Sequence, residues 1–264
     1  MRSLIIFSLT IILAFTSCEK VIDVALKDSE KQYVIEGTVT NNAGDCTVRI
    51  SKTKNFSDNN NFEGIANASV SVTDNNGNTT TLTESAAGVY QSAILTATTG
   101  KTYRLRVNIN GQTFAASCAM PVMVNMDSLY IQEESFFGER LKLANVEYQD
   151  PAGKGNAYRF VQYVNGVKEK SIFIRDDDYS DGNTSTITLF TPPDDEHEIK
   201  TGNTVKVEMQ CIAPALYKYW FSLSQGASGG SNSASPANPV TNIEGGALGY
   251  FSVHTVQSKT VVAP

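Results

Sequence analysis

The chain has 264 residues, 41% of them hydrophobic and 18% charged, so it is long enough for one large or two modest domains. Its 21 Lys and Arg residues against 27 Asp and Glu residues give a net charge of −6, which argues against a nucleic-acid partner and against a basic membrane-binding surface. With two histidines in the whole chain, a histidine-rich zinc site is excluded as well.

The first eighteen residues have the pattern of a bacterial lipoprotein signal. Arg2 is followed by an almost unbroken apolar run, Leu4–Phe15, which is too short for a membrane span of about 20 residues and fits a signal peptide. The small residues Thr16 and Ser17 then precede Cys18. This pattern predicts a signal peptide over residues 1–17 and acylation of Cys18, which would anchor the chain without a transmembrane helix. An ordinary secretory signal with a chance cysteine is the alternative.

Residues 18–31 are polar and mixed in charge, and we interpret them as the lipidated N-terminus and a spacer. Strand signals then recur at short intervals over residues 32–121, with Asn76-Gly77 and Asn110-Gly111 between alternating segments. An Asn-Gly pair in this position predicts a two-residue hairpin whose central residues both take positive φ. Six or seven short strands without a helical period predict a β-sandwich of immunoglobulin or transthyretin type over residues 32–121.

Residues 122–264 predict a second β-rich domain, with a third Asn-Gly hairpin at Asn165-Gly166. Residues 214–225 change to a helical spacing of large apolar side chains, with Pro214 in the first turn and Gly226 as a stop. Residues 226–246 are rich in Gly, Ser, Asn, Ala and Pro and predict a flexible loop. The expected fold is all-β, with two consecutive β-sandwich domains and one helix, at residues 214–225, in the second.

Three cysteines remain after Cys18. Cys46 shares a strand face with Val48 and Ile50, and Cys118 shares one with Phe114. Both side chains are expected to face inward, so in an oxidising compartment they could form a disulfide, or they could be two buried thiols that never meet. Cys211 alternates with apolar residues while Lys206, Glu208 and Gln210 face the other way, so it is interpreted as a core thiol.

Two motifs resemble known catalytic or metal-binding patterns. Gly226–Gly230 matches the G-x-S-x-G pattern around Ser228, and Glu244 and His254 follow in hydrolase order, but the pattern requires a strand before the serine and a helix after it. Here a predicted helix precedes the serine and a loop follows. A hydrolase is therefore a remote alternative, and no catalytic residue is assigned.

The acidic stretch of residues 176–183 resembles a calcium-binding loop. The EF-hand pattern fails because Tyr179 and Thr188 occupy the third and twelfth positions. Asp177 and Asp181 remain candidates for a less regular calcium site, and a solvated hairpin turn is the alternative. No other metal or cofactor is predicted.

Asp127-Ser128-Leu129 resembles the short acceptor sequence used for O-glycosylation in Bacteroidota, which makes Ser128 a candidate glycan site. Further elements belong to the same resemblance: Ser17–Asp23, Val34–Gly37, Met120-Pro121 and Gly245–Phe251. Together they resemble an uncharacterised domain-of-unknown-function family of Bacteroidota outer-membrane lipoproteins, often encoded beside TonB-dependent transporters of the starch-utilisation type. The resemblance covers nearly the whole mature chain and implies a location and a transporter partner, but no activity.

These observations lead to one expectation and two alternatives. We expect a non-enzymatic outer-membrane lipoprotein that serves as an accessory or binding component of a TonB-dependent transport system. A structural or adhesive cell-surface module, which would assemble through sheet edges, is the first alternative. The hydrolase is the second. The sequence leaves open which face of the outer membrane the protein occupies and what its ligand is.

Overall fold

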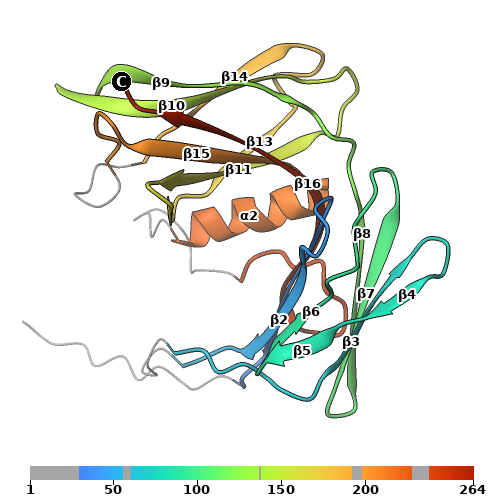
Figure 1. Cartoon of the computed structure of the whole chain (residues 1–264). Helices are drawn as coiled ribbons and strands as arrows, with labels where there is room; N and C mark the ends of the chain where they lie inside the picture. The colour runs from blue at the N-terminus through green and yellow to red at the C-terminus, as the bar shows by residue number, and fades with distance from the viewer. Residues whose placement is uncertain (1–29, 56–60, 137, 192–197, 228–237) are drawn as a thin grey trace, which may run out of the picture. The chain divides into compact units, whose positions relative to one another are not determined.

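The computed structural model describes residues 30–55, 61–136, 138–191, 198–227 and 238–264 (Figure 1). One compact unit, Lys31–Lys54 with Asn59–Pro264, holds every described helix and strand. The other unit is Met1–Glu30 with Asn55–Asp58. The predicted signal peptide and Cys18 lie outside the described residues. In the ranges that are described, no helix has both the length and the apolar character needed to cross a membrane.

Apart from one helix, the regular elements of the described chain are all β-strands, and this confirms the predicted all-β fold class. Its strands are β1 (Tyr33–Thr40), β2 (Cys46–Lys52), β3 (Ser69–Asp74), β4 (Thr79–Thr81), β5 (Thr83–Ala86), β6 (Val89–Gln91), β7 (Thr102–Ile109), β8 (Gln112–Ala119), β9 (Met126–Phe136), β10 (Glu139–Gln149), β11 (Ala157–Val164), β12 (Val167–Lys168), β13 (Phe173–Asp176), β14 (Thr184–Leu189), β15 (Thr204–Cys211) and β16 (Leu248–Val262). The one helix of the described part is α2 (Pro214–Ala227), which begins at the predicted proline.

Two of the three Asn-Gly pairs form the predicted hairpin turns. Asn110 and Asn165 both have a φ of 49°, and the glycines that follow them are also at positive φ. At the third pair, Gly77 has a φ of 87° but Asn76 does not adopt positive φ, so this part of the prediction was wrong. The physical reason is Asp74, whose Oδ1 accepts hydrogen bonds from the backbone N–H groups of Asn76 and Asn78 and stabilises a longer turn.

Three sheets make up the larger unit. The largest has nine strands, in the order β12-β11-β15-β16-β1-β2-β6-β5, with β13 paired to β11. A three-stranded sheet has the order β14-β10-β9, and a four-stranded sheet has the order β4-β3-β7-β8. Strands from the two ends of the chain are thus neighbours in one sheet.

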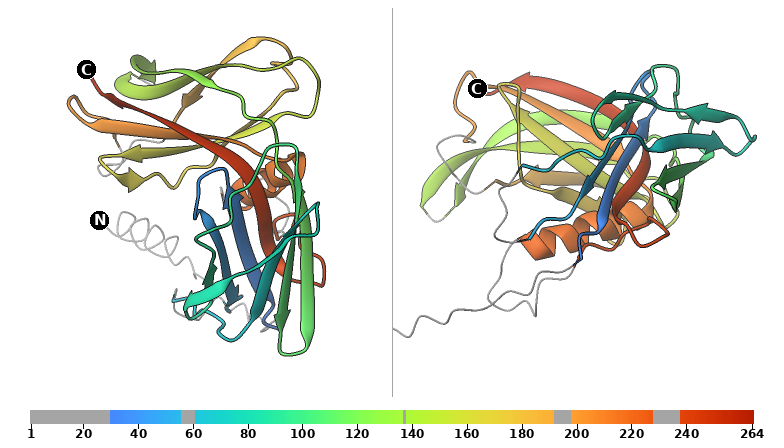
Figure 2. Two further views of the ribbon diagram at one scale, coloured as in Figure 1. Left: turned by 45° about the vertical axis from the view of Figure 1, so that its right-hand side comes forward. Right: turned by 90° about the horizontal axis from the view of Figure 1, so that it is seen from below.

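The last strand, β16, joins the two halves of the sequence. Its residues 248–254 pair in parallel with residues 34–40 of β1, and its residues 255–262 pair antiparallel with residues 204–211 of β15. The long red strand can be followed along this path in Figure 2. The nine-stranded sheet therefore crosses the predicted boundary at residue 121, a connection that the prediction of two consecutive domains did not include.

Two hydrophobic clusters cover this sheet. The β1–β2 region packs with the four-stranded sheet through residues such as Ile35, Val107 and Phe251. The β11–β15 region packs with the three-stranded sheet through residues such as Val146 and Phe160. Because side chains alternate between the faces of a strand, the residues between these apolar positions point to the other face, where the candidate site lies.

Candidate functional site

The polar face of the nine-stranded sheet brings together strands that are far apart in sequence. On β1 it carries Glu36 and Thr40, which pair in register with Tyr250 and His254 of β16. On β15 it carries Gln210, which is in register with Val256 of β16 on one side and with Arg159 of β11 on the other. The register of the two ladders therefore places side chains from four strands on one surface.

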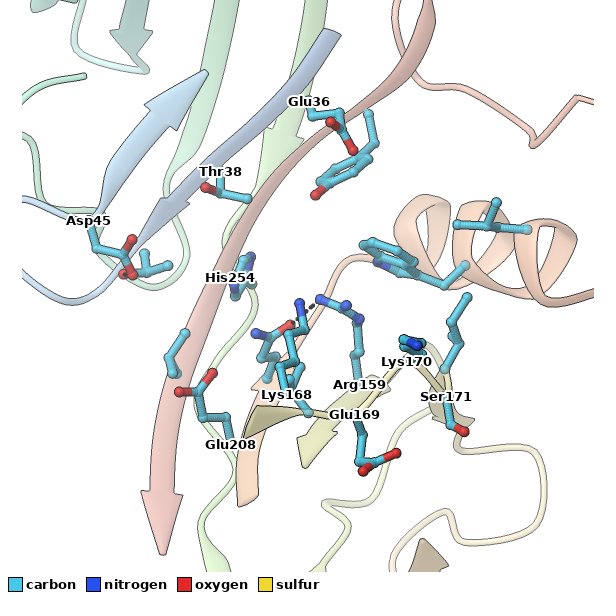
Figure 3. Close-up of a pocket in the computed structure, with 18 of the residues that line it drawn as sticks. Glu36, Thr38, Asp45, Arg159, Lys168, Glu169, Lys170, Ser171, Glu208 and His254 are labelled. Carbon is cyan, nitrogen blue, oxygen red and sulfur yellow. Dashed lines mark hydrogen bonds between the residues drawn. The ribbon is translucent and has the colours of Figure 1, made fainter. Parts of the chain in front are cut away.

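This surface forms the floor of a cavity of about 670 Å³. Trp220 and Leu223 of α2 line the cavity, and so does the segment 168–172, which begins at the end of β12. Figure 3 labels residues Lys168 to Ser171 of this segment. A cavity of this volume is within the usual range for small-molecule sites. The lining combines charged, polar and aromatic groups, so the cavity can bind a ligand that has both a charged and an apolar part.

Arg159 is the central cation of the cavity. Its guanidinium carbon lies 3.8 Å from the centre of the Trp220 ring, and its Nη1 donates to Gln210 Oε1 at 3.2 Å. Burial lowers the pKa of Arg159, because desolvation disfavours the charged form. Tyr250 packs against the same tryptophan, with ring centres 5.0 Å apart. The stacking holds the guanidinium in place on the cavity floor beneath α2.

Lys168 brings a second cation to the same region. It is the last residue of β12, on the hairpin that follows the Asn165-Gly166 turn. Desolvation and the positive charge of Arg159 both lower the pKa of Lys168. Figure 3 shows the side chains of Lys168 and Arg159 approaching each other in the middle of the cavity. Two like charges in a partly desolvated site repel each other, and a bound anion would relieve that repulsion.

Four acidic residues also line the cavity. Glu208 accepts from Lys206 Nζ at 2.7 Å, and Asp45 accepts from the Thr40 hydroxyl at 2.8 Å. Glu36 and Glu169 are the other two. In Figure 3, Glu36 lies on β1, across the cavity from the two cations. Glu36 thus lies away from the two cations, whereas the charge of Glu208 acts on both of them.

Ser252 and His254 form a buried polar pair on β16. The Ser252 hydroxyl and His254 Nδ1 are 2.8 Å apart, and both residues are buried. Burial, together with the charge of Arg159, lowers the pKa of His254 to about 3, so the imidazole is neutral at physiological pH. A general base works best with a pKa near the working pH, so this pair is poorly suited to proton transfer. His254 lines the cavity.

The residues of the hydrolase pattern are not assembled by any described contact. Ser228 lies outside the described residues. Glu244 is exposed and pairs through its backbone with Ala115, whereas His254 bonds to Ser252. In the predicted loop 226–246, residues 226–227 are instead the end of α2, so the predicted helix stop at Gly226 was wrong. Residues 238–246 include this Glu244 bridge, and residues 228–237 are outside the description.

The structure corrects the disulfide hypothesis for Cys46 and Cys118. Both are buried free thiols, which was the alternative interpretation. The Cys118 sulfur lies 3.3 Å from the backbone nitrogen of Val253 on β16, whereas Cys46 lies on β2, where its carbonyl accepts from Ser92. A shared core is not sufficient for a disulfide, because the two sulfurs must also be directed at each other. Cys211 is buried as its alternation predicted.

These thiols should be unreactive in the folded protein. Burial raises the pKa of Cys46 and of Cys118 to about 11, and burial also raises that of Cys211. Because the thiolate is the reactive form, we expect iodoacetamide at pH 8 to leave all three unmodified in the native protein and to modify all three after denaturation without reductant. Peptide mass mapping is the measurement. If iodoacetamide labelled Cys211 but neither Cys46 nor Cys118 in the denatured protein, the hypothesis of a Cys46–Cys118 disulfide would be supported again.

The candidate calcium ligands hold two turns together. Asp177 Oδ2 accepts from the backbone N–H groups of Gly155 and Asn156 at 2.6 and 2.8 Å, and Asp181 Oδ1 accepts from that of Gly153 at 2.6 Å. The positively charged Lys154 ammonium group donates a hydrogen bond to the backbone carbonyl of Asp177. Within the described ranges there is no cluster of three or more Asp, Glu, His or Cys side chains suited to a metal ion.

Ser128 lies within β9 and is half-buried, opposite Glu147 of β10. Lys259 Nζ donates to the carbonyl of the preceding residue, Asp127, at 2.6 Å. The acceptor sequence is therefore part of a regular strand at one edge of the three-stranded sheet. Glycosylation of Ser128 stays a prediction.

Sequence reasoning did not single out Arg159 or Lys168. A signal for Arg159 was present, because it interrupts an otherwise mainly apolar strand, Ala157–Val164. The polar face of β15, with Lys206, Glu208 and Gln210, was recognised, but its neighbours were not. Their proximity follows from strand order in the sheet, which local patterns do not contain.

Two comparisons with known proteins bear on this chain. The model of a protein family described as "Domain of unknown function (DUF4249)" matches residues 19–260. No curated protein matches the chain.

Proposed function

This chain belongs to the DUF4249 family, and from that premise we propose that it is a non-enzymatic binding lipoprotein of the outer membrane that assists a TonB-dependent transporter. The observation that carries the binding role is the 670 Å³ cavity beneath α2, with its half-buried Arg159 and aromatic wall. Its geometry suits reversible binding of a small molecule.

The membrane anchor is supported by the N-terminal sequence. The apolar run Leu4–Phe15 followed by Thr16-Ser17-Cys18 fits a lipoprotein signal, and acyl chains on Cys18 would hold the body at the membrane. The resemblance to Bacteroidota lipoproteins encoded beside TonB-dependent transporters supports the outer membrane as location and such a transporter as partner.

A non-enzymatic role is supported by the groups that could have carried chemistry. His254 is buried with a pKa of about 3, and the three described thiols are buried with raised pKa values. Each of these groups is therefore poorly activated for nucleophilic or acid–base catalysis. The charged groups of the cavity are suited to holding a ligand.

The partner can be tested in the native membrane. We expect gentle cross-linking of the outer membrane, followed by purification of this chain and mass spectrometry, to recover a TonB-dependent transporter in stoichiometric amount. A Cys18→Ser variant is the matched control, because it should lose both the anchor and the transporter. Recovery of the wild-type chain alone would contradict the transporter role, and recovery of its own multimers would favour the structural or adhesive alternative.

A further inference from the structure

We propose that Arg159 and Lys168 form an anion-binding point in the cavity and that its ligand is a small organic molecule bearing a carboxylate or phosphate group. This inference rests on the binding role proposed above and names the chemical class of the ligand.

The first argument is that the two cations lack an anionic partner of their own. No ion pair among the described residues includes Arg159 or Lys168. Arg159 makes one side-chain hydrogen bond within the described chain, to the neutral amide of Gln210, and its buried Nε has no acceptor. A guanidinium has five N–H donors, so Arg159 retains donor capacity for a ligand.

The second argument is that nearby acids do not neutralise this centre directly. Glu208 accepts hydrogen bonds from Lys206 Nζ at 2.7 Å and from the Tyr163 hydroxyl at 3.4 Å, so both of its carboxylate oxygens already have partners. Asp45 is bonded to Thr40. The charges of Glu208 and, more weakly, Glu36 favour the protonated form of Lys168, but desolvation and the charge of Arg159 outweigh them, so the pKa of Lys168 is lowered. Neither acid forms a described ion pair with Lys168. An oxyanion between the cations would form charge-assisted hydrogen bonds with both.

The third argument concerns the rest of the ligand. Trp220, Leu223 and Ile172 add apolar surface to the cavity beside Arg159. The volume of about 670 Å³ is much larger than a bare inorganic anion needs. The combination of a basic centre and an apolar wall fits an oxyanion carried on an organic body, such as a ring or a short aliphatic chain.

The test uses the purified full chain in detergent and ligand-observed ¹⁹F NMR. The probes are 4-fluorobenzoate, 4-fluorophenyl phosphate and the neutral 4-fluorobenzamide. We expect line broadening for at least one of the two anions and little for the amide. Broadening of the benzoate alone identifies a carboxylate ligand, broadening of the phosphate alone identifies a phosphate ligand, and broadening of both identifies a general oxyanion site.

Variants locate the binding. Lys168→Gln changes an exposed hairpin residue and should weaken binding of the anionic probe by roughly tenfold, since one charge-assisted contact is lost. Arg159→Gln should abolish it, and its circular dichroism shows whether α2 is retained. Lys218→Gln removes one positive charge from the exposed surface of α2, outside the cavity, and should bind as wild type does. Because Lys168 lies on the surface hairpin, we expect the Lys168→Gln variant to fold. Its affinity for the anionic probe therefore tests the proposal even if the Arg159 variant does not fold.

The inference is overturned if neither anion binds, if the amide broadens as much as the anions, or if Lys168→Gln binds like wild type. The two proposals can fail separately. If the transporter is recovered but no anion binds, the proposed function is supported and only the proposed ligand class is wrong. Anion binding without a transporter would leave the site standing and remove the transport role.

Discussion

Gly249→Ala is expected to lower the free energy of unfolding by at least about 3 kcal/mol, because it combines a strained backbone with a steric clash. Gly249 has a φ of +98°, and a Cβ on it would lie 2.1 Å from the carbonyl oxygen of Ile35. Ile35 is its partner in the parallel ladder of β1 and β16, so neither backbone can move without disturbing that ladder. Urea unfolding of wild type and variant is the measurement.

Gly246→Ala provides the matched control for this clash. Gly246 has a φ of +86°, but nothing lies within 4 Å of the position that its Cβ would occupy. Its substitution should therefore cost only the backbone strain, about 1 to 2 kcal/mol. Equal losses for the two variants would show that the close approach of β16 to β1 is not what makes Gly249 necessary. The cavity depends on this approach, because it sets Tyr250 and His254 beside Glu36 and Thr40.

Lowering the pH from 7 to 4.5 is expected to remove about 2.5 kcal/mol of stability through His254 alone. The pKa of His254 is lowered from 6.5 to about 3 by burial and by the charge of Arg159. Below pH 6.5 the unfolded chain takes up a proton at this residue while the folded chain does not, so acid favours unfolding. The contribution is therefore fully present above pH 6.5 and decreases as the pH falls toward 3.

His254→Gln isolates this contribution, since glutamine has no titration in the range and can still bond to Ser252. We expect the difference in unfolding free energy between wild type and variant to change by about 2.5 kcal/mol between pH 7 and 4.5. The other histidine, His197, and all carboxylates are common to both proteins, so their effects cancel. Parallel pH curves would show that His254 is protonated, or accessible to protons, in the folded protein.

The sequence was sufficient for most of the local structure. Alternation along segments such as Thr204–Cys211 predicted strands with one apolar face, and the burial pattern of β15 follows it. The helical spacing after Pro214 predicted the helix, and Asn110-Gly111 and Asn165-Gly166 predicted hairpin turns. These features depend on residues close together in the chain, so local patterns contain the information.

Local sequence patterns did not predict the candidate site. The guanidinium carbon of Arg159 lies 3.8 Å from the centre of the Trp220 ring, but the spacing of the two residues in the sequence does not predict this contact. The Cys46–Cys118 hypothesis failed for a related reason. Two inward-facing residues were recognised, but the direction of each sulfur depends on packing against other strands.

The sequence by itself determined the all-β class, the single helix of the described chain, two hairpin turns and the lipoprotein-like N-terminus, because each depends on short-range periodicity or on a contiguous motif. Only the tertiary structure decided that β16 joins β1 to β15 in one sheet, and therefore which polar side chains share the cavity. The physical reason is that strand order and register come from long-range backbone pairing. Many alternative partners would satisfy the same alternation of polar and apolar residues.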